Sequence, residues 1–296
     1  MPSLRSLALL FALPSLLANA ETMSQAAGCT GQSCEIANLS GSTGKLPTTQ
    51  PKGGDAQGWV CITKYNPEGV KAAKAAGSGG GRKGFGKGTG RLVLDQWRGM
   101  GVEAQREKRG MVKRQFGGGK FNGQCKPNIL FFARGTTEMG TMGSTVGPAL
   151  QSGLNAKAPG QWNIQGVPYS ADIAGDNCVG LPGGMIAKEM INQAAEKCKT
   201  SKIFMSGYSE GAMVSHNGVA YASEEAKQKV AAVVVFGDPF NGAPIKGYSG
   251  PIKTYCAAGD QVCTGNFIIG AAHLAYVGTS TSQAVSYMID IAKGGK

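Results

Sequence analysis

Ser209 lies in a short motif whose residue types suit nucleophilic chemistry. The pentapeptide Gly207–Gly211, GYSEG, fits the G-x-S-x-G pattern, in which flanking glycines permit a tight turn that exposes the serine hydroxyl. Three fixed positions recur by chance in a chain with 47 glycines, so an ordinary turn serine is the alternative. An apolar run precedes the motif and a helix-like pattern follows it, and this context favours a nucleophile.

A serine nucleophile needs a base, and the chain contains two histidines. His216 follows Ser209 on the same predicted helix at a distance of roughly 10 Å, so we interpret it as a surface or packing residue. His273 follows every predicted strand and can return on a loop to the edge of a sheet. We therefore predict His273 as the base, which gives the chain order serine, acid, histidine of α/β-hydrolases.

Two aspartates follow predicted strands between the serine and this histidine, and one of them should orient the imidazole. Asp238 precedes Pro239 and is equally well explained as a turn residue. Asp260 lies in a loop that a short disulfide between Cys256 and Cys263 could close, which would fix its carboxylate. Asp260 is therefore the predicted acid.

The elements that must position these groups alternate along the second half of the chain. Short apolar runs that stop at Gly, Pro or a polar turn predict strands, and runs with apolar positions every three or four residues predict helices. The strands are expected at residues 128–134, 162–169, 202–208, 230–239 and 252–260, and the helices at residues 147–157, 183–198 and 210–230. This alternation predicts an α/β fold with a mainly parallel sheet of about five strands, covered by helices on both faces.

The first 20 residues have the composition of a secretory signal peptide. A basic Arg5 precedes an apolar run too short to span a bilayer, and the small-x-small end Ala18-Asn19-Ala20 predicts cleavage after Ala20. We expect an extracellular protein without stable membrane insertion, whose eight cysteines are disulfide candidates.

Residues 21–114 differ in composition from the rest of the chain and are expected to be largely disordered. The stretch 76–120 is rich in Gly, Lys and Arg and has no regular apolar spacing. Dibasic pairs at 108–109 and 113–114 suggest a propeptide, while a linker or wrongly retained untranslated sequence are the alternatives. The net charge of +12 is concentrated in residues 1–114, and because no nucleic-acid-binding motif accompanies it, we predict no nucleic-acid partner.

Three blocks together resemble the fungal cutinases, which are small lidless α/β-hydrolases within a superfamily that includes acetylxylan esterases. They are ILFFARGTTEMGTMG, GYSEGA and YCAAGDQVCTGNFIIGAAHLAY, and the resemblance covers roughly residues 125–296 of a catalytic domain that we predict at residues 115–296. It implies a catalytic triad, an oxyanion hole and two disulfides. Their residues would be Ser209, Asp260 and His273 for the triad, Thr136 and Glu210 for the oxyanion hole, and Cys125–Cys198 and Cys256–Cys263 for the disulfides.

The resemblance also implies a substrate, which would be cutin or another insoluble aliphatic polyester, hydrolysed by a monomer through an acyl-enzyme. Two loops would flank the active site with the apolar side chains of Val179, Leu181, Phe267 and Ile269. Packing of these side chains into the core is the alternative. An acetylxylan esterase and a non-catalytic wall-binding effector are the other functions considered. No metal or cofactor is expected, since no cysteine or histidine has a zinc-ligand spacing.

Glu210 departs from the family, which usually has glutamine after the nucleophile. A carboxylate facing the oxyanion would oppose catalysis, so we expect the side chain to turn away. It would be held by a hydrogen bond or a positive partner near the 134–136 loop, with a solvated carboxylate as the alternative. The pairing of Cys29, Cys34, Cys61 and Cys178 stays open.

Overall fold

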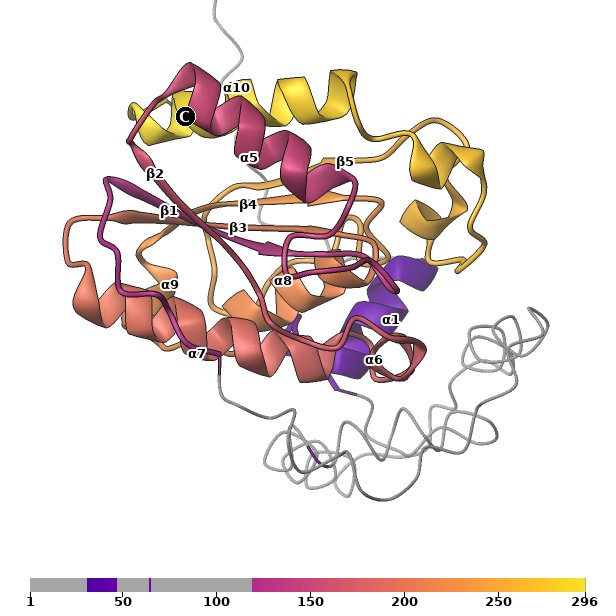
Figure 1. The fold of residues 1–296 in the computed structure, drawn as a ribbon. Helices are drawn as coiled ribbons and strands as arrows, with labels where there is room; N and C mark the ends of the chain where they lie inside the picture. Colours follow the sequence, from indigo (N-terminus) through magenta and orange to yellow (C-terminus); the bar gives the residue numbers. More distant parts are fainter. Residues whose placement is uncertain (1–30, 47–63, 65–118, 296) are drawn as a thin grey trace, which may run out of the picture.

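Five parallel strands form the sheet on which the candidate site is built (Figure 1). The computed structural model describes residues 31–46, Lys64 and residues 119–295. The strand order is β2-β1-β3-β4-β5, and each neighbouring pair is parallel, which confirms the predicted fold. The strands are β1 (Asn128–Ala133), β2 (Trp162–Gly166), β3 (Lys202–Tyr208), β4 (Val230–Phe236) and β5 (Ile252–Tyr255).

Helices cover both faces of this sheet because successive strand side chains point to opposite sides. In β1, Ile129 and Phe131 belong to one buried cluster, and Leu130 and Phe132 belong to the other. The first face is covered by α7 (Leu181–Lys197), α8 (Glu210–Ala220) and the short α9 (Glu224–Lys227), and the second by α5 (Val146–Lys157) and α10 (Thr279–Ala292) (Figure 1).

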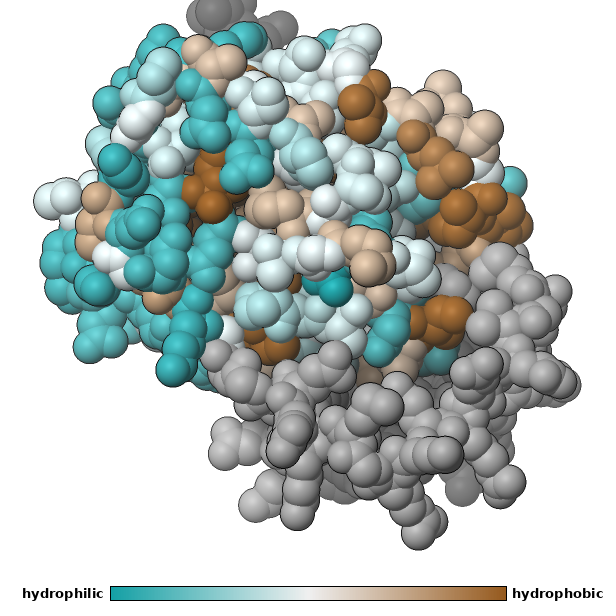
Figure 2. Space-filling view, in the orientation of Figure 1, coloured by the Kyte–Doolittle hydropathy of each residue, from teal (hydrophilic) through white to brown (hydrophobic). Residues whose placement is uncertain are grey.

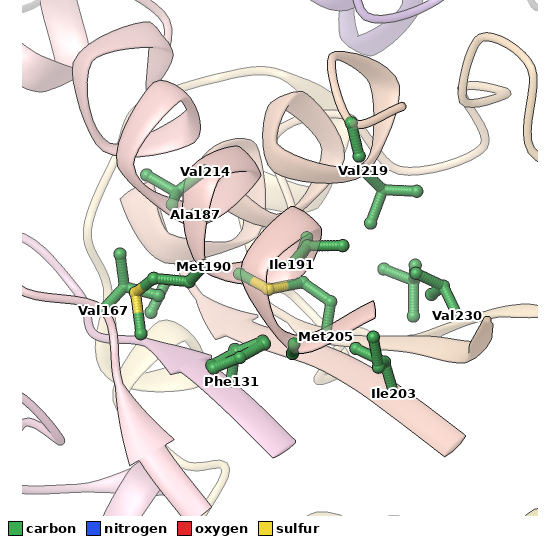
Figure 3. Packing of buried hydrophobic residues seen from close by; sticks show 14 of the residues in the cluster. Phe131, Val167, Ala187, Met190, Ile191, Ile203, Met205, Val214, Val219 and Val230 are labelled. Atoms are coloured by element: carbon green, nitrogen blue, oxygen red, sulfur yellow. The ribbon is translucent and has the colours of Figure 1, made fainter. Parts of the chain in front are cut away.

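The core between α7 and the sheet is tightly packed (Figure 3). Met190 and Ile191 of α7 are fully buried and lie over strand side chains that include Phe131 and Met205. Truncating such a side chain to alanine typically costs about 2–5 kcal/mol of stability. This packing holds α7 and α8 rigidly against the sheet, which fixes the base on which the site is assembled.

The strand register brings the carboxyl ends of three central strands to one edge. Ala133 of β1 pairs with Gly207 of β3, and Tyr208 of β3 pairs with Phe236 of β4. The segments that follow these strands therefore start side by side, as expected for the functional edge of a parallel sheet. One short helix, α6 (Ile173–Asn177), lies between β2 and α7, and two more, η1 (Gln261–Thr264) and η2 (Ala271–Leu274), lie between β5 and α10.

A helix that the sequence did not predict, α1 (Gln32–Ser40), packs against the catalytic region (Figure 1). Ile36 is 2% exposed and Ala37 is fully buried, and both belong to a third apolar cluster with residues of α7 and α8. The structure therefore departs from the expected disorder of residues 21–114 over residues 31–46, because this short apolar face has a surface to pack on. The predicted signal peptide and the rest of the 21–114 segment, apart from Lys64, lie outside the described residues.

Within residues 31–46, 64 and 119–295, no helix is long and apolar enough to cross a membrane.

Candidate active site

Ser209 occupies a tight turn between β3 and α8. Its φ of 58° is in the region that favours glycine, and its N–H donates to the Phe236 carbonyl at 3.0 Å. The glycines of the motif are required by close backbone approaches. A Cβ on Gly207 would lie 1.9 Å from the Gly211 carbonyl oxygen, and one on Gly211 would lie 1.9 Å from that of Ala133. Only glycine therefore fits at both positions around the half-buried serine.

The three residues predicted as a triad lie in one hydrogen-bonded chain. His273, on η2, places its Nε2 2.9 Å from Ser209 Oγ and its Nδ1 2.8 Å from Asp260 Oδ2. Asp260 caps η1, and its Oδ1 accepts a hydrogen bond from Val262 N at 2.9 Å. An imidazole held in this way can take a proton from the serine hydroxyl while the carboxylate stabilises the resulting cation.

The imidazole and carboxylate are fixed by further side chains that the sequence analysis did not identify. The Tyr208 ring stacks on His273 with centroids 5.2 Å apart, and its hydroxyl donates to the His273 carbonyl at 2.8 Å. The Tyr276 hydroxyl donates to Asp260 Oδ2. Burial raises the pKa of Asp260, but hydrogen bonds from His273, Tyr276 and Val262 N outweigh it and leave the pKa below its usual value.

A second histidine–aspartate pair is buried beneath the site. His216 Nε2 lies 3.0 Å from Asp238 Oδ2, and both side chains are almost completely buried. Asp238 Oδ1 also accepts from Phe240 N at 2.8 Å. Of the two alternatives for His216, surface or packing, the burial supports packing, and Asp238 is engaged with His216 rather than with His273.

Two disulfides support the region, and they join the pairs that the resemblance implies. Cys256–Cys263 closes the loop that carries Asp260, and Cys125–Cys198 ties the segment before β1 to the end of α7. Cys34 and Cys178 are also disulfide-bonded, while Cys29 and Cys61 lie outside the described residues.

The loop after β1 brings Thr136 to the same edge, and two charged side chains hold its shape. Glu138 accepts hydrogen bonds from the backbone N–H groups of Gly135, Ser144 and Thr145 at 2.7–3.0 Å. Arg134 Nε donates to the Glu138 carbonyl at 2.7 Å, and its other N–H groups donate to two carbonyls that follow β2. Neither residue was predicted to matter, because a charged side chain in a loop gives no sequence signal of burial.

Thr136 Oγ1 lies 2.8 Å from Asp176 Oδ2 on α6, a contact between residues 40 positions apart that no local pattern predicts. Asp176 is 4% exposed. Burial raises the pKa of Asp176 to about 8; Asp172 adds to this rise, and the hydrogen bond with Thr136 opposes it. The candidate oxyanion residue is therefore in contact with a buried carboxyl group whose raised pKa favours the protonated form.

Glu210 begins α8, so its backbone N–H has no acceptor within the helix and is available to a ligand. Its side chain is 1% exposed, which makes the solvated alternative wrong. Neither carboxyl oxygen has a direct hydrogen-bond partner among the described residues. Burial raises the pKa of Glu210 well above its usual range, Asp176 and Asp172 raise it further, and Thr136 and Arg134 oppose this.

The four predicted substrate contacts do not share one environment. Val179, Leu181 and Phe267 are buried beneath α1 in the third apolar cluster, so packing into the core describes these three. Ile269 is 43% exposed. The sequence could not distinguish the three buried side chains from the exposed Ile269, because it did not indicate that α1 covers part of the loops that carry them.

Exposed large apolar side chains nevertheless gather around the site. Among the described residues all five lie within five positions of either Thr136 or His273, namely Met139, Ile268, Ile269, Leu274 and Val277. Figure 2 shows apolar surface on the side of the molecule where the segment between β5 and α10 lies. Within the described residues no group of three or more His, Cys, Asp or Glu side chains is arranged to hold a metal ion.

Comparison with known proteins gives consistent matches over the same region. The family profile described as Cutinase matches residues 124–291. The chain is similar to a cutinase of Monilinia fructicola, with 35% identity over 57% of this chain and 84% of that protein. It is also similar to cutinase 4 of Emericella nidulans, with 39% identity over 58% and 74%. A Trichoderma reesei cutinase structure in complex with a phosphonate inhibitor superposes with a TM-score of 0.54 and 30% identity, over 57% of this chain and 77% of that one.

Proposed function

The chain belongs to the cutinase family and is a cutinase-type carboxylic ester hydrolase, and we propose that it cleaves aliphatic esters with Ser209 as nucleophile, His273 as base and Asp260 as acid. The observation that carries this proposal is the continuous contact from Ser209 Oγ through His273 to Asp260, at 2.9 and 2.8 Å. Distances in this range allow direct proton transfer between the serine and the imidazole.

The reaction proceeds by acyl transfer in two steps. His273 Nε2 takes the hydroxyl proton as Ser209 Oγ attacks the ester carbonyl, and the alcohol leaves with that proton when the tetrahedral intermediate collapses. Water then attacks the acyl-enzyme and gives a proton to His273, which passes it to Ser209 Oγ as the tetrahedral intermediate collapses and the acid is released. The Glu210 N–H and the Thr136 hydroxyl stabilise the oxyanion, a contribution of about 3 kcal/mol per donor.

The apolar surface around His273 supports an aliphatic polymer such as cutin as the substrate. Exposed apolar side chains that are clustered beside catalytic groups fit contact with a water-insoluble chain. An acetylated xylan would instead require polar side chains in these positions. We also propose that the protein is secreted, since the two disulfides of the catalytic region suit an oxidising compartment.

Replacement of Ser209 tests the reaction. Ser209→Ala should abolish hydrolysis of a soluble p-nitrophenyl ester, since the covalent route is lost. Ser282→Ala, at an exposed position on α10, is the matched control and should leave turnover unchanged. Substantial turnover by Ser209→Ala would contradict the assignment of the nucleophile.

Replacement of the exposed apolar side chains tests the substrate class separately. Ile269→Ser and Val277→Ser should slow release of acid from an insoluble aliphatic polyester several-fold and change hydrolysis of a short soluble ester little. Gln283→Ser, at an exposed polar position of α10, is the control. An equal loss on both substrates would show that the two side chains support the fold or the chemistry and not polymer contact.

A further inference from the structure

Two buried carboxyl groups lie directly beside the proposed oxyanion hole. Asp176 of α6 is 4% exposed and Glu210 of α8 is 1% exposed. The space for the Glu210 carboxyl exists because residue 175 is glycine: a Cβ there would lie 2.1 Å from Glu210 Oε1. Both carboxyl groups therefore lie where α6 meets the start of α8.

The surroundings do not compensate two negative charges at this place. At the N-cap of α6, Asp172 adds a further carboxylate, and from the segment after β2 Tyr169 contributes a neutral hydroxyl. Arg134 is a cation close to Glu210, but its Nε and Nη2 groups donate to backbone carbonyls. An ionised buried carboxylate without such compensation is strongly unfavourable, so the pair is more stable with its protons bound.

A count of hydrogens shows why the proton matters for Thr136. The 2.8 Å contact between Thr136 Oγ1 and Asp176 Oδ2 holds one hydrogen. If Asp176 is ionised, that hydrogen is the one of the hydroxyl group, and none is left for an oxyanion. If Asp176 is protonated, its own hydrogen makes the contact, and the hydroxyl hydrogen is free to point elsewhere.

We propose that Asp176 is a positioning residue that, in its protonated form, donates to Thr136 Oγ1 and so directs the Thr136 hydroxyl hydrogen toward the oxyanion. This rests on the proposed function, in which Thr136 is an oxyanion donor. Asp176 itself does not touch the substrate.

A pH dependence follows from this arrangement. The pKa of Asp176 is raised to about 8, mainly by burial, so Asp176 loses its proton as the pH rises through this value. The carboxylate then captures the Thr136 hydroxyl, and kcat/KM should fall on the alkaline side toward the loss of one oxyanion donor, about 100-fold.

Two substitutions of Asp176 test the role of its proton. Asp176→Asn keeps a permanent hydrogen-bond donor, so it should stay within about threefold of the wild-type kcat/KM at pH 7 and lose the alkaline fall. Asp176→Ala removes the donor, so its kcat/KM should be lower than that of Asp176→Asn at every pH, and it should also lack the alkaline fall. An alkaline fall that persists in Asp176→Asn, or equal losses for the two variants at pH 7, would overturn the proposal.

Asp172→Asn supplies a matched control that leaves Asp176 in place. Asparagine can still accept the hydrogen bond that Asp172 receives from Gly175 N, so the start of α6 is kept. Removing this negative charge favours the ionised form of Asp176, so the alkaline fall should remain and move to lower pH. An alkaline fall that does not move, or one that moves to higher pH, would contradict the assignment to Asp176, even if Asp176→Asn fails to fold.

A stability measurement tests the proton independently of catalysis. Because the folded-state pKa of Asp176 is raised, its contribution to stability is fully present below the usual aspartate pKa and is lost as the pH rises to about 8. The Tm of wild type should therefore decrease more between pH 5 and 9 than that of Asp176→Asn. An equal decrease of Tm between pH 5 and 9 in the two proteins would overturn the proposal. If the decreases of Tm differ as expected but Ser209→Ala stays active, Asp176 is protonated but the proposed function is wrong. The catalytic role of Asp176 is then wrong as well.

Discussion

Asp260→Asn should lower activity with little effect on stability, whereas Asp238→Asn should lower stability with little effect on activity. The two aspartates are closely matched: each accepts a backbone N–H two residues ahead and contacts a histidine through Oδ2. They differ in which histidine they hold. Only the partner of Asp260, His273, reaches Ser209.

The expected magnitudes follow from these contacts. Asp260→Asn offers an amide donor or a weaker acceptor to His273 Nδ1 and should lower kcat by about 10³–10⁴-fold, with little loss of folding. Asp238→Asn weakens a buried pair with His216 and should cost about 2 kcal/mol of stability. For a domain of this size that corresponds to a decrease of about 4–8 °C in Tm, with kcat unchanged well below the transition.

Both quantities can be measured on the same preparations. Turnover of a soluble ester at 20 °C gives kcat, and a thermal melt followed by circular dichroism gives Tm. A large loss of kcat in Asp238→Asn with near wild-type turnover in Asp260→Asn would refute the reasoning and move the acid to Asp238.

Three further outcomes are expected. Ile36→Ala should lower Tm by about 6–12 °C if α1 unfolds together with the domain, since a buried isoleucine contributes about 3 kcal/mol. Faster amide hydrogen exchange in α1 alone, with an unchanged Tm, would show that α1 detaches locally. Replacing Cys256 and Cys263 together by serine should cost about 2 kcal/mol and reduce kcat at temperatures where the fold persists, because the loop that holds Asp260 is released; an unchanged kcat would contradict this. Tyr276→Phe removes a donor that lowers the pKa of Asp260, so the stability lost on acidification should be lost at higher pH; an acid-unfolding midpoint that does not move, or that moves to lower pH, would contradict it.

The sheet and most of its helices could be predicted because their signals are local. Each strand is an apolar run that stops at a turn residue, and β3 extends over Lys202–Tyr208, as predicted. The helix expected at residues 210–230 divides into α8 and α9. The last helix, α10, was not predicted, although its buried positions recur at helical spacing.

The surroundings of the candidate site depend on contacts between distant parts of the chain. Thr136 and Asp176 are 40 residues apart, and nothing local indicates that their side chains meet. Glu210 is a residue type that is almost always exposed, yet here the glycine at 175 leaves space to bury it. The short apolar face of α1 became recognisable only with the surface on which it packs.

The central claim, that Ser209 is the nucleophile activated by His273, is tested most directly by covalent labelling. The full-length protein should be incubated with an organophosphonate ester, and the adduct mapped by mass spectrometry of its peptides. We expect a single adduct on Ser209, absent in Ser209→Ala and formed far more slowly in His273→Ala. An adduct on another serine, or rapid labelling of Ser209 without His273, would contradict the account.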